Sequence, residues 1–350
     1  MRAAARRRGR RRPGRRRPPA AASTVIGVDV GGTTTAVGLV TASGDVIADL
    51  SAATRSGGRD PLETIVDLIA RVTERAGRRA RALAAVGVGV PGPVDAVRGI
   101  VGQPVTHVPE LAGRALAAEL GRRIGLPVAV DNDVNVLALG EATFGAGRGA
   151  RSLVVLSTGT GIGAGIVLEG RLVRGAAGFG GELGHVPVKF DGPLCWCGLR
   201  GCLSIYASGR GIADLARARS AGTSFLEAAG GAPAGITAAM VFRAAEEGDA
   251  VAASIVDEGC QALGAMMGTI VNGLNPEVLI VTGGVVESLA RLEARIRRAV
   301  AEYAFSQALA ATRITIVPGD KRASVRGAAA LARYQQQAPA ADTNKSRRTR

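Results

Sequence analysis

Two stretches of the chain repeat one design, an apolar strand followed by a turn rich in glycine and threonine and then a second strand. The first is TVIGVDVGGTTTAVGLV, residues 24–40, and the second is SLVVLSTGTGIGAGIVLEG, residues 152–170. A repeated supersecondary unit of this kind predicts two related domains that carry the two turns at equivalent places. Strand patterns alternate with helical patterns elsewhere, which favours an α/β fold with helices covering the sheets.

Capping residues and apolar stripes predict the other elements. Asp60 as N-cap and Pro61 at the first helical position begin a helix. Further helices are expected near 110–122, 132–142, 209–218, 237–247, 250–272, 287–303 and 323–334. Strands are expected in LAAVGVGVPGPVD, LPVAVDND, EVLIVTGGV and RITIVPG.

The positive charge of the chain is concentrated at its ends. Residues 1–22 hold ten arginines and no acid, and residues 338–350 hold four basic residues against Asp342, so 13 of the 15 net positive charges lie there. The nearly neutral remainder gives no case for a nucleic-acid-binding surface. We expect residues 1–23 and 336–350 to be disordered, because they lack apolar periodicity. The leader is interpreted as a solvated or spuriously translated extension, with a tail for an anionic partner as the alternative.

The sequence also bears on location. No stretch reaches the roughly 18 consecutive apolar residues of a membrane span, so no membrane contact is expected. The leader has no apolar segment of the kind that a secretory signal requires. Four cysteines without a regular framework of spacings favour a reducing cytoplasm.

The two glycine-rich turns are candidate phosphate sites. Glycines at a strand end let backbone N–H groups approach an anion, and threonine hydroxyls add donors. The chain has no GxxxxGK[ST] sequence, which excludes a Walker loop. Gly159, Gly161 and Ala164 fit the loose dinucleotide pattern, but a predicted strand follows where that pattern needs a helix. Ordinary glycine-rich hairpins are the alternative, although Asp29 beside the first turn is costly to bury without a cation or its water.

Seven motifs in one order resemble the ROK (repressor, ORF, kinase) group of sugar kinases, glucokinase-like, within the actin, Hsp70 and sugar-kinase superfamily. They are DVGGT, STGTGIGAG, GVPGPVD, VDNDVN, GGELGH, CWCGLRGC and VTGGV, and the resemblance covers about residues 24–335. It implies a two-domain, ribonuclease H-like fold that binds Mg-ATP and a hexose in the cleft between domains and phosphorylates the 6-hydroxyl. We expect a smaller α/β domain at 24–130 and a larger one at 131–322, with the closing helix 323–335 returning to the first.

The resemblance also implies roles for individual residues. Asp29 would orient magnesium through water, and Gly283 and Gly284 would approach the adenosine. The phosphates would be held by the two turns, that is by Gly31, Gly32, Thr33, Thr158, Gly159, Thr160 and Gly161.

The VDND sequence places two carboxylates at the junction of a strand and a helix. Helix capping is the structural interpretation, because Asp and Asn are preferred caps. The resemblance implies instead that Asn132 binds a sugar hydroxyl and that Asp133 is the general base of phosphoryl transfer. We expect the helix N-terminus to lower the pKa of Asp133 and keep it ionised.

Four potential metal ligands lie close together in the sequence. His185, Cys195, Cys197 and Cys202 have the spacing H-x9-C-x-C-x4-C, and four N/S donors are typical of a closed tetrahedral zinc site. Reactive thiols or ordinary buried residues are the alternatives, and Cys260 is interpreted as core. The resemblance implies that Glu182 and His185 touch the sugar, so that one imidazole nitrogen binds a structural zinc while the other faces the hydroxyls.

One position departs from the family pattern. The resemblance implies a sugar-binding glutamate two residues after the last of these cysteines, where this chain has Ser204. We expect phosphorylation to survive and the affinity for glucose to fall, with a bridging water or a bulkier N-acylhexosamine in the vacated space.

Proteins of other classes remain alternatives. A catalytically weak sugar-binding protein is one, and a sugar-responsive regulator is another. About 23 residues precede the first strand, which are too few for the winged-helix domain of such regulators. A homodimer is expected, because dimers are common among symmetric enzymes.

Overall fold

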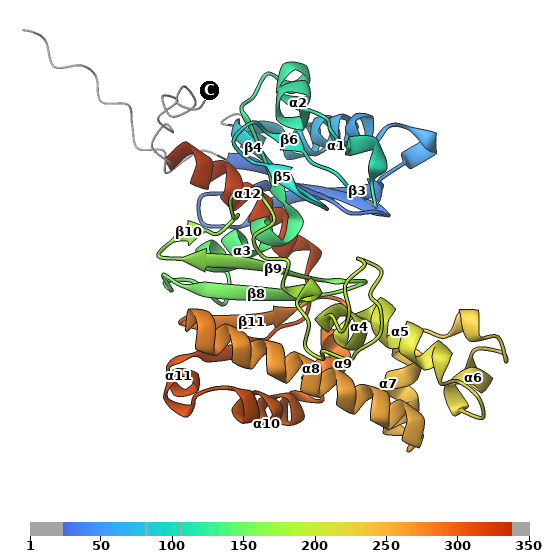
Figure 1. The fold of residues 1–350 in the computed structure, drawn as a ribbon. Coiled ribbons are helices and arrows are strands. Elements are labelled where there is room, and N and C mark those ends of the chain that lie inside the picture. Colours follow the sequence, from blue (N-terminus) through green and yellow to red (C-terminus); the bar gives the residue numbers. More distant parts are fainter. Residues whose placement is uncertain (1–23, 81–82, 106, 338–350) are drawn as a thin grey trace, which may run out of the picture.

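The computed structural model describes residues 24–80, 83–105 and 107–337, and its two five-stranded sheets dominate the architecture (Figure 1). The strands of the first sheet are β1 (Thr24–Val30), β2 (Thr34–Val40), β3 (Val46–Ala53), β4 (Leu83–Val90) and β7 (Val128–Asn132). Those of the second are β8 (Leu153–Thr158), β9 (Ile162–Leu168), β10 (Arg171–Leu172), β11 (Val278–Thr282) and β12 (Arg313–Ile316). A short ribbon pairs β5 (Val94–Asp95) with β6 (Ile100–Val101).

The two sheets share one topology. Their strand orders are β3-β2-β1-β4-β7 and β10-β9-β8-β11-β12. In each, the hairpin with the glycine-rich turn is antiparallel, and the next two strands run parallel to its first strand. The duplication expected from the sequence is therefore confirmed, and both turns lie at equivalent places in an α/β fold.

Twelve α-helices complete the described part of the chain. They are α1 (Pro61–Ala76), α2 (Leu116–Ile124), α3 (Asp133–Phe144), α4 (Leu203–Ala207), α5 (Gly209–Ala218), α6 (Ser224–Ala228), α7 (Ala238–Glu246), α8 (Ala250–Leu274), α9 (Val286–Ala290), α10 (Glu293–Tyr303), α11 (Ser306–Ala311) and α12 (Lys321–Gln337). None of them is long and apolar enough to cross a membrane.

Alternation along the central strands buries both faces of each sheet. Ile26 and Val28 of β1 pack against α1 and α2, whereas Val25 belongs to the cluster that α12 covers. In the second sheet, Val154 packs toward α4, α5, α7 and α8, and Val155 packs toward α3 and α12. Successive side chains of a strand point to opposite faces, so each sheet needs helices on both sides.

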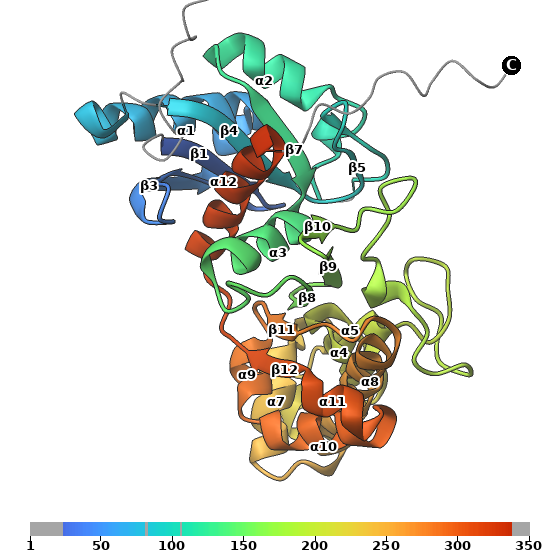
Figure 2. The same cartoon turned by 90° about the vertical axis from the view of Figure 1, so that its left-hand side faces the viewer.

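Helices α3 and α12 lie side by side between the two sheets (Figures 1 and 2). The C-terminal helix α12 packs on β1 and β4, and α3 packs on β8 and β9. The two helices meet at small residues, since a Cβ built on Gly140 would lie 2.8 Å from Cα of Gly327. This close helix pair connects the two sheets and sets their relative position.

Several predicted elements are confirmed and others are corrected. Asp60 caps α1 by accepting a hydrogen bond from the Leu62 amide at 2.8 Å, and α5 has the predicted limits. The helix expected near 110–122 begins only at Leu116, because Gly113 adopts a left-handed φ of 74° that a continuous helix cannot contain.

The ends of the chain and the edge of the first sheet also differ from expectation. Residues 336 and 337, expected in the tail, are the last residues of α12, while 1–23 and 338–350 lie outside the described residues. Strand β3 was missed because it is a half-exposed edge strand with little apolar alternation.

The glycines beneath α12 give the first prediction. A Cβ on Gly87 of β4 would lie 1.7 Å from the carbonyl oxygen of Ala328, so Gly87→Ala must push α12 off the sheet. We expect the free energy of unfolding to fall by about 2 kcal/mol or more, measured by thermal and urea denaturation. Gly273→Ala is the control, because that exposed helical glycine has no atom within 4 Å of the added carbon. It should be neutral or slightly stabilising, and equal loss in both variants would contradict close packing at Gly87.

Candidate active site

Two cavities meet at the turn between β8 and β9. The larger, of about 950 Å³, is lined from the first sheet by Gly32 and Thr33 and from the second by the turn at 159–161. The smaller, of about 580 Å³, is lined by residues of α5 and α7 and by the turn after β11. Gly159 and Thr160 line both cavities. The ends of the two sheets therefore form one cleft with two compartments.

The predicted phosphate and adenosine residues divide into two groups. Those that line the larger cavity are Gly32, Thr33, Gly159, Thr160 and Gly161, and Gly284 lines the smaller one. The others shape the turns. The amide of Gly31 donates to the Thr34 carbonyl at 3.0 Å, and the buried Thr158 hydroxyl donates to the Thr282 carbonyl at 3.1 Å. Gly283 has a φ of 114°, and a Cβ there would lie 2.3 Å from the Thr158 carbonyl oxygen.

The junction of β7 and α3 brings both predicted roles of the VDND sequence together. Asn132 is the N-cap of α3, since its Oδ1 accepts from the amides of Val134 at 2.9 Å and Asn135 at 3.2 Å. Asn132 and Asp133 also line the larger cavity. Capping therefore holds both side chains at the cleft, and the structural and functional interpretations are compatible.

The pKa of Asp133 differs from the expectation. Burial raises the pKa of this carboxyl to about 7, and the nearby charges of Asp29 and Glu182 also raise it. The hydrogen bond from the Val134 amide, at 2.9 Å, lowers the pKa but does not compensate. The prediction that the helix N-terminus keeps this pKa low is wrong, because desolvation and the neighbouring carboxylate outweigh it.

Asp131, two residues before Asp133, lies in a different environment. It is 1% exposed and pairs with Arg174 at 2.6 Å, and it accepts from the Asn135 side chain at 3.0 Å. Arg174 also lies over the Tyr334 ring of α12 at 5.7 Å. This pair ties the segment after β10 to β7 and α12. No local pattern in the sequence indicates this pair, because its partners are 43 residues apart.

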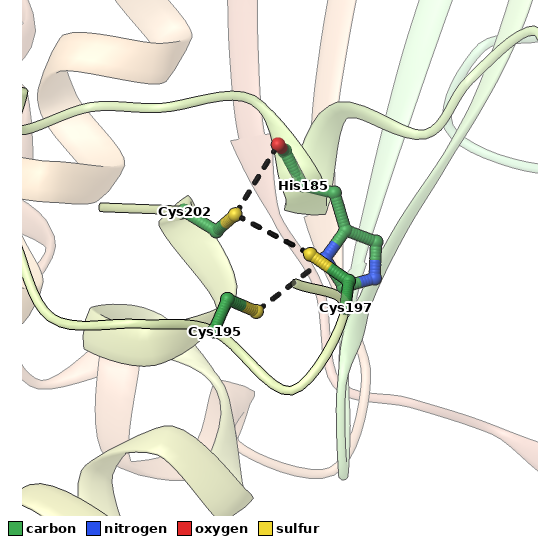
Figure 3. Close-up of side chains that lie close together, drawn as sticks. All are labelled: His185, Cys195, Cys197 and Cys202. Carbon is green, nitrogen blue, oxygen red and sulfur yellow. Dashed lines mark hydrogen bonds between the residues drawn. The ribbon is translucent and has the colours of Figure 1, made fainter. Parts of the chain in front are cut away.

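The four potential metal ligands converge (Figure 3). One donor atom from each of His185, Cys195, Cys197 and Cys202 lies within 4.8 Å of the others. The Cys195 Sγ to His185 Nδ1 distance and the Cys197 Sγ to Cys202 Sγ distance are both 3.7 Å. A tetrahedron with zinc–sulfur bonds of about 2.3 Å has edges of about 3.8 Å, so the donor set fits zinc.

The surroundings of this cluster connect it with the cleft. His185 and Glu182 line the larger cavity. The second nitrogen of the His185 ring points away from the three sulfur atoms (Figure 3). Burial raises the pKa of the Cys202 thiol to about 12. Cys260 is buried in α8 and contributes to the core, as expected.

Ser204 does not line the cleft. Its side chain is fully buried and its hydroxyl has no hydrogen-bond partner among the described residues. A Cβ on Gly184 would lie 2.8 Å from this hydroxyl, so the backbone beside His185 fills the adjacent space. The structure therefore gives no support to a water bridge from Ser204 to a sugar.

Three cleft residues were missed at the level of sequence. Trp196 and His107 line the larger cavity, and Arg210 lines the smaller one. The only available signals were weak: Trp196 is the single tryptophan and separates two clustered cysteines, and Arg210 follows a glycine at a predicted helix start.

Comparison with known proteins agrees with this geometry. The chain is 36% identical over 311 residues to the glucokinase of Thermotoga maritima, covering 88% of this chain and 96% of that protein. It is 31% identical over 315 residues to the N-acetyl-D-glucosamine kinase of Photobacterium profundum, covering 87% and 98%. The crystal structure of a ROK family glucokinase from Streptomyces griseus in complex with glucose and AMPPNP matches with a TM-score of 0.71 and 32% identity, covering 89% and 100%. Residues 25–335 match the ROK family, and the chain belongs to that family.

Proposed function

We propose that this protein transfers the terminal phosphoryl group of ATP to the 6-hydroxyl of a hexose, with Asp133 as the general base. The position of Asp133 carries the proposal: it lines the larger cavity beside both glycine-rich turns. A base is most effective when its pKa lies near the working pH, and burial raises the pKa of Asp133 to about 7. The similarity to the Thermotoga maritima glucokinase supports the same reaction.

The two compartments suit the two substrates. Adenosine would occupy the smaller cavity beside Gly284, and the phosphates would lie at the shared turn of Gly159 and Thr160. Backbone amides at such a turn can approach phosphate oxygens closely. Asp29 would hold the magnesium of Mg-ATP through water, and that cation neutralises phosphate charge during transfer. The transferred group would then face the larger cavity.

Polar groups in the larger cavity would orient the sugar. Asn132, Glu182 and His185 line it together with Asp133. His185 would bind zinc through Nδ1, and the thiolates of Cys195, Cys197 and Cys202 would be the other three ligands. Zinc would be structural there: it would fix the His185 ring so that Nε2 meets the sugar hydroxyls. A cytoplasmic location and a homodimer stay predictions.

An N-acylhexosamine kinase is the second candidate. The similarity to the Photobacterium profundum N-acetyl-D-glucosamine kinase favours it. Ser204 does not bear on this choice, because its side chain is fully buried and does not line the cleft. Turnover of glucose, mannose and their N-acetyl amines, compared at equal ATP, distinguishes the two candidates.

Replacement of the proposed base is the direct test. Asp133→Asn keeps the shape of the side chain but cannot accept the proton, so we expect kcat to fall by about 10²- to 10⁴-fold. The dissociation constants of ATP and the sugar should change little, as measured by calorimetry. Asp67→Asn on the exposed side of α1 is the control and should keep full activity. Near-normal turnover of Asp133→Asn on every sugar of the panel would refute the assignment.

The raised pKa predicts the pH dependence of activity. Because burial raises the pKa of Asp133 to about 7, kcat/KM for the sugar should rise with pH and level off above about that value. The Asn variant should lack this dependence in its residual activity.

The same shift predicts the pH dependence of stability. The folded state binds a proton at Asp133 that the unfolded chain releases above about pH 4, so this group stabilises less and less as the pH rises from about 4 to about 7. Asp133→Asn should therefore raise Tm at pH 8 more than at pH 5. An equal change at both values would contradict the raised pKa.

Zinc has its own test. We expect about one zinc per chain in purified protein by metal analysis. Chelation or Cys197→Ser should weaken sugar binding and shift the emission of Trp196, the only tryptophan. Cys260→Ala is the control and should keep its zinc, because Cys260 lies in the core. A metal-free preparation with full sugar affinity would contradict the assignment.

A further inference from the structure

Arg210 lines the smaller cavity beside the turn that both cavities share. It is the second residue of α5, and its amide donates to the Thr160 carbonyl at 3.2 Å. The amide of Gly209 donates to the Gly159 carbonyl at 2.9 Å. These two bonds fix the first turn of α5 to the β8–β9 turn that both cavities share. The side chain of Arg210 therefore starts beside the proposed phosphate site.

The guanidinium of Arg210 lies over the ring of Trp196, with Cζ 4.5 Å from the ring centroid. Stacking of this kind orients the planar cation and leaves the N–H donors at its edge available. Asp214 is an ion-pair partner of Arg210 at 3.5 Å, but Asp214 contacts Arg217 more closely, at 2.6 Å. The Arg210 side chain is 51% exposed, so an anion can reach it.

Other cations are less suited to this place. The sequence holds only three lysines, and none is adjacent to either glycine-rich turn. Arg217 also lines the smaller cavity, but its guanidinium donates to Asp214 at 2.6 Å and to the Ile236 carbonyl at 2.9 Å. Among the arginines that line the smaller cavity, Arg210 is thus the one with the weaker protein contacts.

We propose that Arg210 binds the phosphates of the nucleotide and that Trp196 holds its guanidinium in position. This inference rests on the proposed kinase function and adds a side-chain cation to a site otherwise made of glycine and threonine turns. Trp196 also meets the His185 ring edge to face, with centroids 6.3 Å apart. The Trp196 ring therefore contacts one residue of each compartment. Through Arg210 it would connect the segment of clustered cysteines with the nucleotide.

Calorimetry with ATP and with adenosine tests the proposal. Arg210→Ala should weaken ATP binding about tenfold, the loss typical of one charge-assisted contact. Adenosine has no phosphate, so its affinity should be unchanged. Arg243→Ala is the matched control, because Arg243 is exposed on α7 and lines neither cavity, and it should bind both ligands normally. Arg210→Lys should recover only part of the loss, since a lysine keeps the charge without the planar fork.

The single tryptophan adds an independent readout. ATP should change the emission of Trp196 in the unmutated protein, and the change should be much smaller in Arg210→Ala or when adenosine replaces ATP. Trp196→Leu should weaken ATP binding less than Arg210→Ala, and combining the two should give less than the sum of the single losses. The metal content of Trp196→Leu, measured in parallel, should stay unchanged.

The outcomes separate this proposal from the proposed function. Equal ATP dissociation constants for Arg210→Ala and the unmutated protein would overturn the role of Arg210, while undiminished hexose turnover would leave the kinase assignment intact. Equal losses of ATP and adenosine affinity would also overturn it, since they would indicate a damaged pocket. No ATP binding by the unmutated protein would contradict both proposals.

Discussion

The position of the site depends on helix α3, which packs closely against both β9 and α12. Glycines make both contacts possible. A Cβ on Gly165 of β9 would lie 2.5 Å from the Val134 carbonyl oxygen, and one on Gly327 of α12 would lie 2.3 Å from that of Val136. The first turn of α3 therefore packs on the second sheet. The same helix also packs on α12, which covers the first sheet. Asp133 begins α3, so its distance from both glycine-rich turns is set by backbone contacts. Side chains larger than glycine would move the carboxylate away from the turns.

This arrangement places several carboxylates near the cleft, and their charged neighbours differ. Asp131 is neutralised by Arg174 at 2.6 Å inside the protein. Asp133 has Asp29 and Glu182 as charged neighbours, and with burial they raise its pKa to about 7. Like charges that share a partly desolvated site cost stability unless a cation or a proton joins them. The cost is concentrated at the cleft, where a proton acceptor and a magnesium-bound nucleotide are proposed to meet.

The sequence was sufficient for features that depend on local pattern. The repeated turns predicted two related domains, and the two sheets indeed share one strand order. The spacing from His185 to Cys202 predicted four converging donors. The sequence was not sufficient for features that depend on tertiary contacts. The raised pKa of Asp133, the pair of Asp131 with Arg174, and the enclosed side chain of Ser204 all depend on segments that meet only after folding. The contact of Arg210 with Trp196 is of the same kind, because α5 and the cysteine segment are joined only by tertiary structure.

A bound metal would help to stabilise the loop between His185 and Cys202. Phe190 is 97% exposed and Leu194 is 64% exposed, so apolar burial contributes little to fixing the outer part of this loop. Its backbone hydrogen bonds, such as those from the Cys195 amide to the Leu199 carbonyl at 2.7 Å and from the Val188 amide to the Gly201 carbonyl at 2.9 Å, join parts of the loop to one another. Four clustered donors can supply the missing stabilisation, because metal binding energy is folding energy when the site forms only in the folded state. Cys195 and Cys202 are themselves buried in the apolar core of the second sheet, so a bound metal would connect the sugar compartment to that core.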